Sequence, residues 1–189
     1  MIVQKPVRTV APSGLPVTLA EAKAQCRVDH DTEDALLNGL IAAAVAHVDG
    51  YTGVLGRALL TQTWRIDADE PGDIAIPLEP VQSVSVQWVD KAGAVQSFTQ
   101  FDLVRGHGHP YIQLKDTAVW PDTKTQPDAF RVTAVVGYGA AADVPQPIKQ
   151  AILLMVAHLY ANREAVGEAM QAVPMAVDAL LAPYRLVGI

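Results

Sequence analysis

Two histidines one residue apart, His107 and His109, are the side chains in this sequence best suited to hold a metal ion. They lie in the Gly/His-rich stretch 106–110, and imidazole nitrogens are common ligands of zinc and other transition metals. Asp102 and Asp116 are weak candidates for further ligands. No HExxH or similar spacing supports the site, and a solvent-exposed turn explains the same residues. The sequence therefore favours a turn over a metal site.

The other histidines and the acidic residues give weaker signals. His47 and His158 lie in predicted helices, where packing accounts for them, and His30 lies between acids that suit helix capping better than catalysis. A cluster of carboxylates surrounds Pro71-Gly72, but it lacks the order of an EF-hand loop and resembles a solvated turn. The cluster consists of Asp67, Asp69, Glu70 and Asp73.

The motifs of nucleophilic catalysis and nucleotide binding are missing from the sequence. No GxSxG is present, and the serines have no convincing base partner. The glycines of residues 137–139 (GYG) match neither GxGxxG nor a P-loop. We therefore predict no catalytic residues, no cofactor and no metal, and we favour a structural or interaction protein over an enzyme. The alternative is a small metal-dependent enzyme that uses His107 and His109.

Composition bounds the class of protein further. The chain has 189 residues, half of them hydrophobic, which suits one domain with a substantial core. Its net charge of −6 argues against tight binding to DNA phosphates, which needs a basic face. The single cysteine, Cys26, excludes an internal disulfide, and the N-terminus lacks the apolar region of a signal peptide. We expect synthesis in a reducing cytoplasm and no association with a membrane.

Helical periodicity is strongest in residues 144–163 (VPQPIKQAILLMVAHLYANR), which we predict to be the central helix. Its apolar stripe, formed by Ile148, Ile152, Met155 and Leu159, widens until the helix is apolar almost all round, which is typical of a buried helix. The apolar run is too short to cross a membrane. After residue 163 the pattern loosens, and a short helix is expected from Pro174 to the helix-stopping Pro183.

Two more helices are predicted near the N-terminus. Thr18 and Glu21 fit a capping box at the start of a short helix. Asp31 is predicted to cap a second helix over residues 32–51, whose stripe of leucine, isoleucine, valine and alanine residues needs cover.

A change of period marks a β-lobe between these helices and the central one. Strands are expected at residues 59–67, 74–78, 81–89, 95–101, 103–105, 111–114 and 130–136, as a small antiparallel sheet or barrel. The predicted fold class is α+β, with a helical core of two long and two short helices and an inserted antiparallel β-lobe. The predicted parts are an arm (1–17), helical core (18–57), β-lobe (58–139), and helical core with a tail (140–189). Part of the arm could pair as an edge strand.

An ordered series of short motifs resembles the head–tail connector (adaptor) proteins of tailed bacteriophages and gene transfer agents. Most of the motifs are caps, turns and core positions, so the resemblance lies in their order along nearly the whole chain. Cys26 is a departure, since a larger aliphatic residue is common there. The motifs are residues 16–23 (PVTLAEAK), 27–29 (RVD), 33–34 (ED), 43–44 (AA), 52–53 (TG), 62–64 (QTW), 80–84 (PVQSV), 136–139 (VGYG), 144–145 (VP), 148–152 (IKQAI), 160–164 (YANRE) and 183–185 (PYR).

The resemblance implies a non-enzymatic subunit of a ring of about twelve copies in the neck of a virion or virus-like particle. Such a ring lies below the portal protein, extends the DNA channel and offers a docking surface to a tail-side stopper or tail terminator protein. An acidic or neutral lumen would let DNA pass without binding. Another tail-completion component with a similar β-lobe remains an alternative.

The two chain ends are the predicted contact segments, because neither can bury its apolar residues well alone. By resemblance to connectors, the part from Pro174 onward is the better candidate for gripping the portal, and the N-terminal arm for lying on a neighbouring subunit. The candidate contact residues are Tyr184, Arg185, Leu186, Val187 and Ile189 at one end and Val3 and Val7 at the other.

Overall fold

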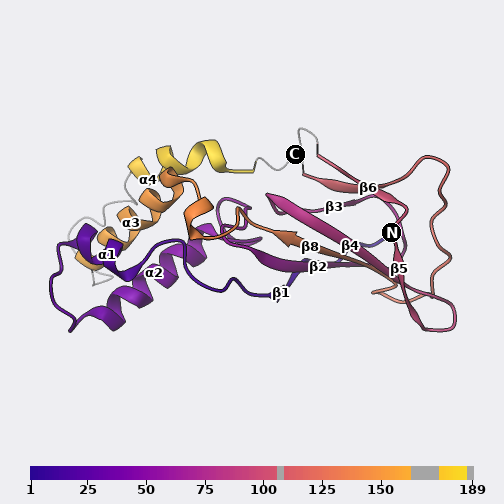
Figure 1. Cartoon of the computed structure of the whole chain (residues 1–189), viewed down its shortest axis with the longest axis horizontal. Helices are drawn as coiled ribbons and strands as arrows, with labels where there is room; N and C mark the ends of the chain where they lie inside the picture. The colour runs from indigo at the N-terminus through magenta and orange to yellow at the C-terminus, as the bar shows by residue number, and fades with distance from the viewer. Residues whose placement is uncertain (106–108, 163–174, 187–189) are drawn as a thin grey trace. The chain divides into compact units, whose positions relative to one another are not determined.

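A computed structural model describes residues 1–105, 109–162 and 175–186 of the chain (Figure 1). The chain divides into two compact units. One, here called the strand unit, consists of Met1–Pro12 and Thr61–Gly137. The other, the helical unit, consists of Ser13–Leu60 and Tyr138–Leu186. The described residues contain both helices and antiparallel sheets, so the fold class is α+β, as predicted.

The helical unit contains four α-helices within the described residues. They are α1 (Leu19–Cys26), α2 (Asp34–Val48), α3 (Gln146–Ala161) and α4 (Met175–Leu181), with 3-10 turns η1 (Ala141–Asp143) and η2 (Ala182–Tyr184). Thr18 and Glu21 form the predicted capping box of α1. None of the helices in the described part of the chain is both long and apolar enough to span a membrane.

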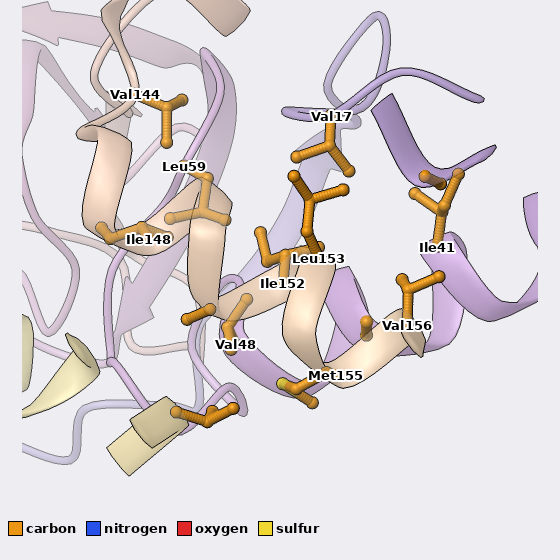
Figure 2. Packing of buried hydrophobic residues seen from close by; sticks show 14 of the residues in the cluster. Val17, Ile41, Val48, Leu59, Val144, Ile148, Ile152, Leu153, Met155 and Val156 are labelled. Atoms are coloured by element: carbon orange, nitrogen blue, oxygen red, sulfur yellow. The ribbon is translucent and has the colours of Figure 1, made fainter. Parts of the chain in front are cut away.

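The core of the helical unit is built mainly from α2 and α3 (Figure 2). The buried residues recur every three or four positions along α2 and are denser along α3, and the two sets belong to a single hydrophobic cluster. Burial of these side chains supplies most of the stability of helices that would be marginal alone. The buried residues are Leu37, Ile41, Ala44 and Val48 on α2, and Ile148, Ala151, Ile152, Leu153, Met155 and Val156 on α3.

The structure corrects three details of the helix predictions. Helix α2 begins at Asp34 after Glu33, and Asp31 does not cap it, because the Asp31 carboxylate binds Lys23 Nζ at 2.6 Å. Leu159 is 36% exposed, so the predicted apolar stripe of α3 is buried only as far as Met155 and Val156. Pro183 lies inside η2, where the missing N–H of a first-turn proline costs little.

Eight short strands form two antiparallel sheets in the described part of the strand unit. The strands are β1 (Val7–Val10), β2 (Gln62–Ala68), β3 (Ile74–Ala75), β4 (Val81–Val89), β5 (Val95–Phe98), β6 (Phe101–Val104), β7 (Tyr111–Leu114) and β8 (Phe130–Val136). The five-stranded sheet has the order β1-β2-β8-β4-β5, and the three-stranded sheet the order β3-β7-β6.

Strand alternation places one apolar face of the larger sheet inward. Register pairs Val84 with Ala134, Val86 with Val132 and Trp88 with Phe130, so the alternating residues of β4 share one face, as the period of two predicts. Trp120 packs against both Phe98 and Phe130, with ring centroids 5.3 and 5.5 Å apart, respectively. This aromatic group belongs to the core of the strand unit.

Asp67 departs from the prediction of a solvated acidic turn. It lies within β2, is 9% exposed and accepts a hydrogen bond from Arg65 Nε at 3.1 Å. The strand extends one residue beyond the predicted end because its register with β8 continues to Ala68. The Asp67 carboxylate, which the sequence pattern assigns to the surface, is therefore buried within the sheet.

Candidate functional site

The C-terminal candidate segment begins with α4, which presents one apolar side to the helical core. Val177 and Leu181 of α4 are buried, while Met175 is 88% exposed. The turn of η2 then brings the chain to the loop that follows α2. Of the predicted contact residues here, Tyr184 and Leu186 are half-buried and Arg185 is exposed, whereas Val187 and Ile189 lie outside the described residues.

The loop after α2 holds this segment by two hydrogen bonds. Arg57 Nε donates to the carbonyl oxygen of Tyr184 at 2.6 Å, and the backbone N–H of Leu186 donates to the carbonyl oxygen of Leu55 at 3.0 Å. Gly56, with φ of +63°, lies between these two partners, and a Cβ there would approach the Cβ of Leu186 to 3.4 Å. The segment therefore has a fixed place on its own unit.

Arg185 carries the exposed charge of this segment. Its guanidinium donates a hydrogen bond to Asp178 Oδ1 of α4 at 2.6 Å, and both side chains are largely exposed. Exposed pairs of this kind contribute little to stability. The pairing of Arg185 with Asp178 therefore adds little to the stability of this segment.

The N-terminal candidate segment runs along one edge of the larger sheet. Val3 forms an isolated antiparallel bridge with Ala68, and Val7 pairs with Arg65 in β1. The backbone N–H of Gln4 also donates to the carbonyl oxygen of Asp67 at 2.8 Å. The arm is thus a strand edge of the strand unit, the possibility that its alternating apolar residues left open.

Acidic residues fix the start of this segment. The Met1 amino group lies 3.3 Å from a Glu70 carboxylate oxygen, and the backbone N–H of Ile2 donates to Asp69 Oδ1 at 2.5 Å. A mainly apolar hollow of about 340 Å³ lies beside them and is lined by Ile2, Gln4, Asp69, Thr125, Gln126 and Pro127. The hollow is not predictable from local patterns, because its walls come from three segments that lie far apart in the sequence.

The residues proposed for chemistry do not come together in the described structure. His109 is described but His107 is not. Asp102 lies 4.0 Å from Lys115, an ion pair, and the His47 and His158 side chains belong to α2 and α3. Within residues 1–105, 109–162 and 175–186, no group of three or more His, Cys, Asp or Glu side chains is arranged to hold a metal ion.

Electrostatic shifts in the helical unit follow from capping and ion pairing. The hydrogen bond from the Thr18 backbone holds the pKa of the Glu21 carboxyl below its ordinary value. Asp31, followed by Asp34, raises the pKa of Lys23 through side-chain hydrogen bonds. Burial raises the pKa of the Cys26 thiol, which disfavours the reactive thiolate. These shifts describe structural contacts, and none of them creates a nucleophile.

Residues 16–103 match the family described as phage gp6-like head-tail connector protein. That region runs from the entry to α1 through β5 and into β6. No curated protein matches the chain.

Solved structures of gene transfer agent (GTA) particles contain chains of the same fold. A chain from the virion of a native GTA particle has a TM-score of 0.77 and 25% identity, and the alignment covers 98% of this chain and 97% of that one. Chains from the neck of an empty particle computed with C6 symmetry and of a native particle computed with C12 symmetry, both 24% identical, give TM-scores of 0.76 and 0.75. Together with the family match, these likenesses support a head–tail connector protein, as the sequence motifs indicate.

Proposed function

We propose that this chain is the subunit of a ring in the neck of a tailed virus-like particle. About twelve copies lie below the portal protein, extend the DNA channel and present a docking surface to a tail-side stopper or tail terminator. The observation that carries the proposal is the whole-chain likeness to a chain of a GTA virion, which covers 98% of the sequence and so both units. The C12 symmetry of a similar neck structure supports the copy number.

The charge of the chain suits a channel through which DNA must move. Its net charge of −6 offers few cations to neutralise phosphates, and phosphate neutralisation is the main source of nonspecific affinity for DNA. A ring of such subunits would guide DNA without retaining it. The role is architectural and requires no catalytic residue.

Genetic removal of the chain tests this role. In a strain that produces tailed particles with this chain, deleting its coding sequence should leave DNA-filled heads and separate tails, and supplying the chain in trans should restore joined particles. Electron microscopy counts the three classes. Joined particles at the normal frequency in the deletion strain would contradict a connector role.

We assign the portal contact to the segment from α4 to the C-terminus. Its support is the exposed outer face of α4 and the exposed Arg185, beside a tail of apolar residues. Two truncations form a matched pair: removal of residues 187–189 keeps both hydrogen bonds to the loop after α2, whereas removal of residues 184–189 eliminates them. Both should lose co-sedimentation with DNA-filled, tailless heads. Normal co-sedimentation of the longer truncation would exclude the assignment.

A further inference from the structure

Exposed apolar side chains are concentrated at the N-terminal edge of the larger sheet. Residues 1–10, here called the N-terminal edge, hold five of them: Met1, Ile2, Val3, Val7 and Val10. Val7 and Val10 of β1 are each 56% exposed. Val7 and Val10 share one face of the sheet, because they pair with Arg65 and Thr63. Exposed apolar residues that lie together on one face suit the binding of another surface.

Both outer strands of the five-stranded sheet have one unpaired side within the described structure. Strand β1 pairs only with β2, and β5 pairs only with β4. The two strands have the same length of four residues, and Val95 of β5 is 50% exposed. The backbone groups on such an edge form a template for one more strand.

The order of the sheet fixes the relative direction of these two edges. All four neighbouring pairs in β1-β2-β8-β4-β5 are antiparallel, so β1 and β5 run in the same direction. A second copy placed beside the first without inversion therefore brings its β1 next to β5 in parallel. Such a contact joins two different surfaces and can repeat around a ring, whereas pairing of β1 with β1 would end at a dimer.

The charges of the two edges favour a second copy of this chain as the partner of β1. Lys5 and Arg8 are the charged side chains of the first 20 residues, and the remainder of the chain has 12 Lys and Arg against 20 Asp and Glu. In the turn between β4 and β5, the Asp90 carboxylate accepts hydrogen bonds from Gln96 Nε2 at 3.0 Å and the Ala94 N–H at 2.9 Å. The bond from Gln96 is the largest cause of its lowered pKa, so Asp90 is ionised at neutral pH. Parallel alignment brings Lys5 to the same end of the contact as Asp90.

We propose that β1 of each copy pairs in parallel with β5 of the next, so that the larger sheets join around the ring. This inference rests on the proposed ring function and names its lateral contact. Lys5, Pro6 and the bulge between Arg8 and Val10 are features that limit indiscriminate edge pairing. The bulge lies within β1, so only a partner strand that fits this irregular edge should pair with it.

Single cysteines on the two edges test the pairing directly. Cys26, the only native cysteine, is first changed to alanine. Val7 lies on the face of Arg65 and Thr133, and Ser97 lies on the same face through Gln87 and Arg131. The Val7→Cys and Ser97→Cys variants are therefore added together to DNA-filled heads as the neck assembles, and the particles are treated with a short bis-maleimide reagent. Val119→Cys, at an 82% exposed position outside both edges, controls for random collision.

The mixture should give a cross-linked dimer at a yield at least about tenfold above either variant alone or either mixed with Val119→Cys, because docking raises the local concentration. A chain with both cysteines should give a ladder beyond the dimer. Cross-linked dimers from Val7→Cys alone would overturn the proposal in favour of a two-fold contact. Chains that sediment with heads but give no mixed cross-link would overturn the strand pairing and leave the connector role standing. Absence of the chains from heads would count against both.

Discussion

The backbone N–H of Leu186 donates a hydrogen bond to the carbonyl oxygen of Leu55 at 3.0 Å, which attaches the end of the described chain to the loop after α2. Arg57 adds a second bond to the carbonyl oxygen of Tyr184. The half-buried Leu186 side chain thus serves its own helical unit. The C-terminal segment has a structural role beside the portal contact proposed for it.

Removal of residues 184–189 should lower the free energy of unfolding by roughly 1–3 kcal/mol, since a net hydrogen bond contributes about 0.5–1.5 kcal/mol and two are lost. Urea titration followed by circular dichroism measures this. The truncation of residues 187–189, which keeps both bonds, is the control. Equal stability of the two truncated chains would mean that the Leu55 and Arg57 contacts contribute nothing.

Ile152 tests the core of the helical unit. It is fully buried within α3, so Ile152→Ala should reduce the free energy of unfolding by about 2–5 kcal/mol through lost burial and a residual cavity. Leu159→Ala, on the same helix but 36% exposed, should cost far less. Similar losses for both variants in urea titration would show that α3 does not have the buried face described here.

The capping box of α1 predicts a pH dependence. Thr18→Ala should cost about 1 kcal/mol, since a side-chain N-cap is lost. Hydrogen bonds from Thr18 lower the folded-state pKa of Glu21 below the ordinary 4.5. The stability that Glu21 contributes is therefore fully present above its unfolded-state pKa, and it is lost as the pH falls through its folded-state pKa.

Glu21→Gln can still accept the capping bond but does not titrate, so it should flatten the acid limb of stability against pH. Thermal melts from pH 6 downward, at roughly half-unit steps across the carboxyl range, would measure the slope. An acid limb as steep in this variant as in the parent chain would exclude Glu21 as its source.

Two glycines should respond to alanine in opposite ways. A Cβ at Gly53 would lie 2.5 Å from the carbonyl oxygen of Asp49, so Gly53→Ala should destabilise the chain by more than about 1 kcal/mol. At Gly39, within α2, no atom other than the helix's own backbone and the adjoining residues lies within 4 Å of such a Cβ, and Gly39→Ala should stabilise by up to about 1 kcal/mol through helix propensity. A melting temperature that shifts in the same direction for both would contradict this packing.

Local periodicity predicted much of the fold. The capping box of α1, the bounds of β4, β7 and β8 and the existence of α2 and α3 depend on spacing within a short window, which the sequence carries directly. Asp31 was assigned wrongly because its partner, Lys23, belongs to the preceding helix. The predicted strand 59–67 includes Asp67 correctly, but the expected solvent exposure of its carboxylate is wrong, because β2 pairs with β8, more than sixty residues away, as far as Ala68.

The candidate contact segments likewise combine features that local sequence predicts with contacts that it does not. Their apolar residues were apparent in the sequence, as was the possible edge strand. The attachment of Leu186 to Leu55 could not be predicted, because a backbone hydrogen bond between residues 131 positions apart leaves no pattern in either segment. Gly56, with its positive φ, is a nearby residue whose type signals an unusual backbone.

Electron cryomicroscopy of the neck in joined particles that contain the chain would show whether the chain forms the proposed ring. We predict a ring of about twelve copies of this fold between the portal and the tail, with the DNA channel passing through it, and particles without the chain should lack that density. A particle with a complete neck into which the fold does not fit, or a chain located in another part of the particle, would contradict the account.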